Sequence, residues 1–72
     1  MKYYLINPVF NKEQMLITNN HAIYEIETEI KHKNATIKDC IFIKVNRMIF
    51  KLIINEINND YCKLELTSNV YV

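Results

Sequence analysis

The chain has 72 residues and contains no glycine. Glycine adopts positive φ angles at little steric cost and lets the backbone approach a phosphate closely. Phosphate-binding loops, dinucleotide fingerprints, nucleophile elbows and EF-hand calcium loops all depend on it. We therefore expect a protein that is not an enzyme and holds no cofactor, and other residues must form its turns.

The size and charge of the chain restrict the choice further. Half of the residues are hydrophobic and the formal net charge is +1, so we expect a single small domain over residues 1–72 with one modest core. No apolar run approaches the ~18 residues of a membrane span, and the N-terminal apolar stretch is too short for a signal peptide. These features predict a cytoplasmic protein with free thiols and no membrane contact.

The composition also suggests a source. Residues encoded by AT-rich codons, such as Ile, Asn, Lys and Tyr, are frequent, whereas glycine is absent and there is one proline. This bias is typical of a low-GC bacterium, its phage or another mobile element. It describes the gene more than the fold.

Asparagine is the non-glycine residue that most often adopts left-handed backbone angles, so its positions should mark the turns. Its marks at 19–20, 34, 46 and 58–59 are spaced by about 13 residues, which is typical of a β-meander. Between two of these marks, residues 22–31 alternate between an apolar and a polar face, which favours a strand. The sequence therefore predicts an all-β fold, a small antiparallel β-meander or partly open barrel of five to six strands.

The expected turns bring the apolar faces together in register. A loop at 33–34 sets Ile26 opposite Ile41, and a loop at 46–47 sets Ile43 opposite Phe50. A three-residue loop at 58–60 sets Ile54 opposite Leu64 and Leu52 opposite Leu66. Two further strands are expected at 2–6, ending before Pro8, and at 70–72. Closing such a sheet without glycine requires β-bulges or a second copy of the chain.

A rival interpretation places a helix at about 47–58, which would make the fold α+β. Asn46 would then be the N-cap, and Ile49, Phe50, Ile53 and Ile57 would share one side of the helix. We favour the strand because isoleucine is β-branched and because the registers agree with one another.

The second face of the predicted sheet is mixed, with apolar side chains among charges. Such a patch often marks an interaction site. Three explanations stay open, namely cover by the terminal segments, a homodimer contact, or a protein partner. The candidate partner-binding residues are Ile23, Phe42, Ile49, Ile53, Glu25 and Glu27.

Other residues have a site interpretation and a simpler one. Glu25, Glu27 and Glu29 would form a carboxylate ladder on a strand, able to contact a basic partner or a divalent ion, although a solvated face is the simpler reading. Asp39 falls on the apolar face, where its pKa would be raised unless a bulge near 38–39 turns it to water. The spacing of Cys40 and Cys62 fits no zinc pattern, and the two are expected on opposite faces. They should therefore form neither a metal site nor a disulfide.

These observations lead to one functional expectation. We expect a non-enzymatic β-module that binds another protein, as a homodimer or with a separate partner, and that acts as a phage or mobile-element inhibitor or accessory factor directed at a host protein. The alternative is a small OB-like or SH3-like barrel that binds nucleic acid. It is disfavoured because the charge is balanced and few aromatic residues are expected beside lysines on the exposed faces.

Overall fold

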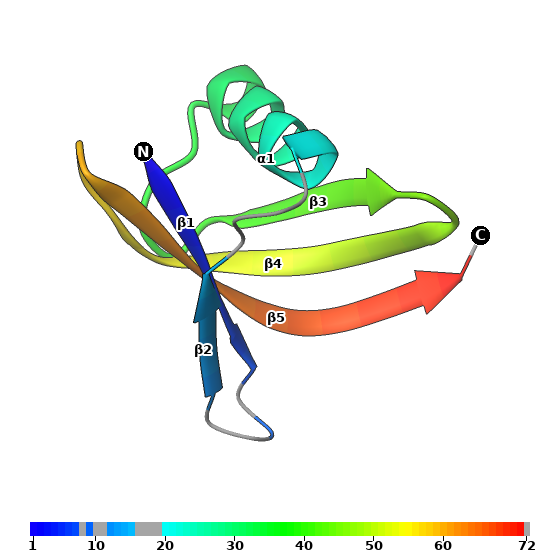
Figure 1. Cartoon of the computed structure of the whole chain (residues 1–72). Coiled ribbons are helices and arrows are strands. Elements are labelled where there is room, and N and C mark those ends of the chain that lie inside the picture. The colour runs from blue at the N-terminus through cyan, green and yellow to red at the C-terminus, as the bar shows by residue number, and fades with distance from the viewer. Residues whose placement is uncertain (8, 10–11, 16–19, 72) are drawn as a thin grey trace.

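The computed structural model describes residues 1–7, 9, 12–15 and 20–71, with the backbone alone for 12–15. In chain order the elements are β1 (Lys2–Asn7), β2 (Lys12–Met15), α1 (Asn20–Lys33), β3 (Cys40–Val45), β4 (Met48–Ile57) and β5 (Tyr61–Tyr71). The strands form one sheet in the order β2-β1-β5-β4-β3. β4 and β5 form a long, curved hairpin, and α1 lies beside β3 (Figure 1). The expected small β-rich fold is confirmed.

The two hairpins of the C-terminal half have the predicted registers. In the β3–β4 hairpin Val45 pairs with Met48 and Ile43 with Phe50. In the β4–β5 hairpin Ile54 pairs with Leu64. The rival interpretation of a helix at 47–58 is therefore wrong, because the alternating apolar residues of this segment bury one face of a strand.

Two irregularities interrupt the β4–β5 ladder, and both agree with the expectation that this sheet would need bulges. The register shifts between Lys51 and Leu52, and again between Ile54 and Glu56. Bulges of this kind bend a strand and increase its twist. They supply curvature to a hairpin that has no glycine.

The predicted strand at 22–31 is wrong, because this segment lies in α1. Ile23, Ile26 and Ile30 recur at helical spacing and pack on the core, while Tyr24, which the strand interpretation placed beside Ile26, is 65% exposed. Glu29 and Lys33 form an i,i+4 ion pair at 3.3 Å, and the last turn carries Lys31, His32 and Lys33. Basic residues there interact favourably with the helix dipole.

Asn34 ends α1 instead of forming a β-turn. Its φ angle is 51°, its N–H donates to Lys31 O at 3.2 Å, and the next N–H, that of Ala35, donates to Ile30 O at 2.9 Å. This pair of bonds is the Schellman motif, which satisfies carbonyl groups at a helix C-terminus. Asparagine thus adopts the left-handed conformation, as expected, but in a helix cap.

The N-terminal strand also departs from an antiparallel meander. β1 lies inside the sheet, antiparallel to β2 and parallel to β5, with Tyr3 beside Cys62. The predicted strand at 2–6 is confirmed, and the segment near 70–72 is the end of β5 as far as Tyr71. Pro8 and the predicted turn residue Asn19 lie outside the described residues, whereas Asn20 begins α1.

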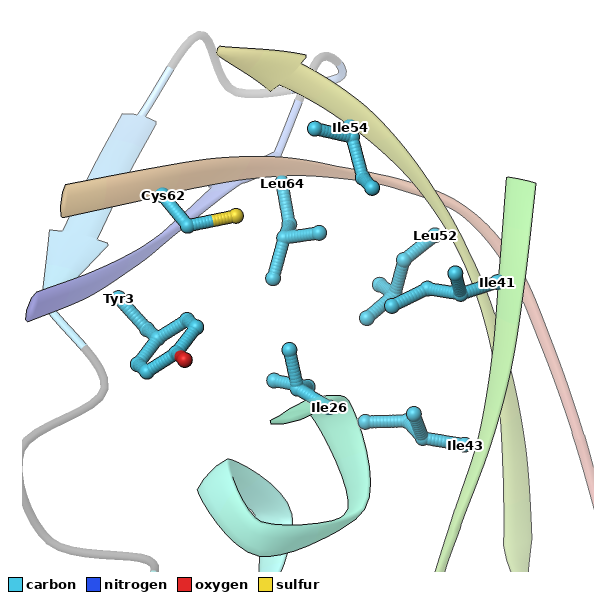
Figure 2. Close-up of a cluster of buried hydrophobic side chains, with 8 residues drawn as sticks. All are labelled: Tyr3, Ile26, Ile41, Ile43, Leu52, Ile54, Cys62 and Leu64. Atoms are coloured by element: carbon cyan, nitrogen blue, oxygen red, sulfur yellow. The ribbon is translucent and has the colours of Figure 1, made fainter. Parts of the chain in front are cut away.

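The core lies between α1 and the concave face of the sheet. Ile26 of α1 is fully buried and points into a cluster of sheet side chains (Figure 2). The other members of this cluster are Tyr3, Ile41, Ile43, Leu52, Ile54, Cys62 and Leu64. We call this the inner face of the sheet.

Asp39 is exposed, which agrees with the simpler of its two interpretations. Its carboxylate accepts the N–H of Thr36 at 2.8 Å. Lys38 has a φ angle of 72°, its N–H donates to Ile54 O at 2.7 Å, and Ile54 N–H donates to Asp39 O at 3.0 Å. Two residues thus lie opposite one, which is a β-bulge that turns Asp39 toward water.

Candidate interaction surface

The outer face of the sheet is the face that points away from α1. Side chains alternate along a strand, and residues paired across two strands lie on the same face. The residues between the buried ones, together with their partners, therefore lie on the outer face. Among the described residues, the outer face carries Lys2, Tyr4, Ile6, Cys40, Phe42, Lys44, Ile49, Lys51, Ile53, Glu56, Tyr61, Lys63, Glu65, Ser68 and Val70.

The β3–β4 half of the outer face is the more apolar half. Phe42 is 49% exposed, and Ile49 and Ile53 are partly exposed on the neighbouring strand. Lys51 pairs with Phe42 and Lys44 pairs with Ile49, and both lysines are exposed. We call Phe42, Ile49 and Ile53 the Phe42 patch.

A further basic group comes from the end of α1. The Nζ atom of Lys33 lies 5.2 Å from the centroid of the Phe42 ring, a distance at which an ammonium group is attracted by an aromatic face. The Phe42 patch is therefore bordered by lysines.

The structure brings together three of the six residues proposed as partner-binding, and they form the Phe42 patch. The other three lie on α1. Ile23 packs on the core, and Glu25 Oε1 lies 3.7 Å from His21 Nε2 on the same helix. Glu27 accepts a hydrogen bond from the Tyr3 hydroxyl at 3.0 Å. The acidic border predicted for the patch is wrong, because it depended on a strand at 22–31.

The carboxylate ladder is also wrong. Residues two apart on a helix are turned by about 200° from each other, so Glu27 points away from Glu25 and Glu29. Within the described part of the chain, no group of three or more His, Cys, Asp and Glu side chains is placed to hold a metal ion.

The β1–β5 half of the outer face carries an aromatic cluster that sequence reasoning missed. The rings of Tyr4 and Tyr61 meet edge to face, with centroids 6.3 Å apart, and Lys63 Nζ lies 5.9 Å and 5.5 Å from them. The Tyr61 hydroxyl donates to a carboxylate oxygen of Glu56. We call Tyr4, Tyr61 and Lys63 the tyrosine cluster.

A signal for this cluster existed in the sequence. Tyr4 and Lys2 are two residues apart, and so are Lys63 and Tyr61, so each strand has a basic and an aromatic residue on one face. The parallel pairing of β1 with β5 then joins the two. Local patterns do not reveal that pairing, which links distant parts of the chain.

Among the described residues, Tyr61 on the outer face and two groups of the core, Tyr3 and Cys62, have raised pKa values. The hydrogen bond to Glu56 is the main cause that raises the pKa of Tyr61. Burial, followed by the bond to Glu27, raises the pKa of Tyr3. Burial also raises the pKa of the Cys62 thiol to about 11, which favours the neutral thiol in the core.

The two cysteines lie on opposite faces, as predicted. Cys40 pairs with Ile53 on the outer face, whereas Cys62 is buried in the inner cluster. Both are free thiols.

A shallow pocket of about 270 Å³ lies where β1, α1 and the end of β4 meet. Its lining residues are Met1, Tyr3, Glu27, Ile30, Lys31 and Ile57. The lining is mainly apolar, and Glu27 already accepts the Tyr3 hydroxyl there.

Comparisons with family models, curated proteins and solved structures found no match. Among the described residues, no helix has the length and apolar character needed to cross a membrane.

Proposed function

We propose that the protein is a non-enzymatic binding module whose partner is another polypeptide, held by the Phe42 patch. The observation that carries the proposal is the exposure of Phe42, at 49%, next to the partly exposed Ile49 and Ile53. An apolar patch rimmed by charges is the usual composition of a contact surface, with an apolar centre and a polar rim.

The charges of the rim favour a particular kind of partner. Lys33 lies over the Phe42 ring but is already paired with Glu29 on α1, whereas Lys44 and Lys51 are exposed beside the patch. Two copies packed face to face would bring these lysines together, which opposes association. A separate polypeptide with apolar side chains and neighbouring carboxylates fits the patch better than a second copy does.

The biological role that we propose follows from the composition of the chain. In a phage or other mobile element of AT-rich codon usage, the partner would be a host protein, and the module would act as its inhibitor or accessory factor.

The proposal is tested by substituting the patch. Immobilised wild-type protein is incubated with lysate of the source organism, and the retained polypeptides are compared with those retained by a Phe42→Ser/Ile49→Ser variant. Tyr24→Ser is the matched control, because Tyr24 is also an exposed aromatic residue but lies on α1. Wild type and Tyr24→Ser should retain a common partner that the double variant loses, while far-UV circular dichroism stays unchanged.

Sedimentation velocity on the same proteins identifies the partner's class. A dimeric wild type that becomes monomeric in the double variant would make the partner a second copy. Retention of the partner by the double variant would contradict the proposal, as would loss of the fold.

A further inference from the structure

We propose that the free edge of β5 at residues 66–71 pairs with the same edge of a second copy of the chain, so that two sheets join into one. We call residues 66–71 the β5 edge segment. This dimer does not rest on the protein-binding proposal, because it uses an edge of the sheet and not the outer face.

The β5 edge segment extends beyond the strand that flanks it on one side. β1 pairs with β5 from Tyr61 to Glu65, whereas the pairing of β5 with β4 continues as far as Tyr71. Beyond Glu65, β1 and β5 run apart (Figure 1). In the described part of the chain, no strand therefore pairs with the β1 side of the β5 edge segment, which presents free backbone N–H and C=O groups there.

The β5 edge segment has few of the features that protect an exposed edge. Its sequence, Leu-Thr-Ser-Asn-Val-Tyr, contains no charge and no proline, although lysine and proline are common on natural edges. Its bulge, at Thr67, lies near one end. Val70 is 57% exposed and Tyr71 is 81% exposed. By contrast, β3 at the end of the strand order carries the exposed Lys44, so the β5 edge segment is the better site for strand addition.

Geometry restricts the register of such a pair. A two-fold axis perpendicular to the sheet makes the two strands antiparallel and keeps every side chain on its own face. Because the faces alternate along a strand, one residue then lies opposite itself. If that residue were Ser68, Tyr71 would lie opposite the copy's Glu65, where Ile6 already pairs. The register centred on Ser68 is therefore blocked.

The register centred on Asn69 displaces no described residue. It sets Val70 opposite the copy's Ser68 and Tyr71 opposite the copy's Thr67. A pair of an aromatic and a β-branched residue stabilises neighbouring strands. The two Asn69 amides lie side by side at the axis, and each has both donors and an acceptor. The β5 edge segment is thus complementary to itself.

The nearest lysines do not oppose this arrangement. Lys51 pairs with Ser68 and lies on β4, one strand away from the β5 edge segment. In the dimer the two copies of Lys51 would lie on strands three spacings apart, about 14 Å, whereas the Debye length at physiological salt is about 8 Å. Face-to-face packing of two Phe42 patches would bring the lysines much closer together. A second copy therefore fits the edge better than it fits the outer face.

Sedimentation equilibrium at several protein concentrations tests for the dimer. The paired segment is short, so the wild type should pass from monomer to dimer as its concentration rises, with a Kd in the micromolar range. Asn69→Asp has nearly the same shape but sets two carboxylates opposite each other at pH 7, and it should raise this Kd by about tenfold or more. A wild type that is monomeric at every concentration overturns the inference.

Asn55→Asp is the matched control for charge. Asn55 is an exposed residue of β4 outside the β5 edge segment. The control adds the same negative charge to the chain and should dimerise as the wild type does. An equal rise of the Kd in Asn55→Asp and Asn69→Asp would contradict the edge contact.

Disulfide cross-linking locates the axis. Residues opposite each other on antiparallel strands have Cα atoms about 4.5–5.5 Å apart, a separation that a disulfide spans. Oxidation with copper phenanthroline should give a covalent dimer of Cys40→Ala/Asn69→Cys and not of Cys40→Ala/Asn55→Cys. Cys62 is retained in both variants because it is buried in the core. Equal cross-linking of both variants would contradict the register.

The two proposals fail separately in these experiments. Phe42→Ser/Ile49→Ser should dimerise with the wild-type Kd, and Asn69→Asp should still retain the partner polypeptide from lysate. A dimer that is lost in Phe42→Ser/Ile49→Ser and kept in Asn69→Asp would overturn the edge contact in favour of the outer face. A monomeric wild type whose capture of the partner is lost in Asn69→Asp would show that a strand of the partner occupies the edge, which also overturns the inference.

Discussion

In the part of the chain that the structure describes, three residues take over the role that glycine has in most folds. Asn34, Lys38 and Asn46 have φ angles of 51°, 72° and 57°. Asparagine tolerates this region because its short polar side chain can bond locally, whereas a lysine side chain gains nothing comparable from it. Of these three positions, Lys38 is therefore the one where the absence of glycine costs the most stability.

Replacing Lys38 by glycine should stabilise the protein. The substitution relieves the left-handed strain at the bulge, partly offset by the greater freedom of glycine in the unfolded chain, and we expect a gain of about 0.5–1 kcal/mol. Equilibrium urea unfolding measures it. Lys51→Gly, in the interior of β4, is the control and should lose stability, and a destabilised Lys38→Gly variant would contradict the proposed strain.

The buried thiol of Cys62 should make stability depend on pH in the alkaline range. Its pKa rises from 9.0 to about 11 in the folded protein, so the thiolate is favoured in the unfolded chain. The stabilisation is complete below pH 9 and is lost as the pH rises toward 11, with about 1.4 kcal/mol lost by pH 10. The raised pKa of Tyr3 acts in the same direction at higher pH.

Urea unfolding at pH 8 and pH 10 measures this dependence. Cys62→Ala should show a smaller loss of stability between the two pH values than the wild type. Cys40→Ala, which retains Cys62, should show the wild-type loss. An unchanged dependence in Cys62→Ala would rule out the thiol as its source.

A pair of substitutions on α1 distinguishes the helix from the predicted strand. A strand at 22–31 would place Tyr24 and Ile26 on the same buried face, whereas the helix exposes Tyr24 and buries Ile26 completely. Ile26→Val should therefore cost about 0.5–1.5 kcal/mol, and Tyr24→Ala less than about 0.5 kcal/mol. Urea unfolding that gives the larger loss for Tyr24→Ala would contradict the helix.

The strands of the C-terminal half were predictable because their pairing is local. Asn46 marks a two-residue turn, and alternation on both sides of it leaves one register that buries Ile41, Ile43 and Leu52 together. In the next hairpin, the turn at 58–60 and the same alternation place Ile54 opposite Leu64. In each case the turn residue and the apolar pattern agree.

The helix and the N-terminal strand were not predictable in the same way. Ile26 and Ile30 belong both to a period of two and to a helical stripe with Ile23, so the apolar pattern of this segment is ambiguous. The signals that separate the two interpretations are the i,i+4 pair of Glu29 with Lys33 and a basic last turn before Asn34. The pairing of β1 with β5 joins segments about 60 residues apart along the chain, for which local pattern has no signal.

At the scale of the whole molecule, one helix and one sheet produce two different surfaces. The inner face is filled by the core, and the outer face carries the Phe42 patch and the tyrosine cluster. Half of the predicted binding residues lie on this outer face because β3 and β4 were placed correctly. The tyrosine cluster could not be predicted without knowing that β1 pairs with β5. The basic rim could not be predicted without knowing that Glu25 and Glu27 lie on α1.

The measurement that tests this division most directly is a titration of protein labelled at the isoleucine δ1 methyl groups, followed by NMR, with the captured partner polypeptide. Isoleucine occurs on both faces, so the methyl signals report on each face separately. Ile49 and Ile53 should shift or broaden, while Ile26 and Ile41 in the core stay unchanged. Changes confined to the isoleucines of α1, with Ile49 and Ile53 unaffected, would contradict the account.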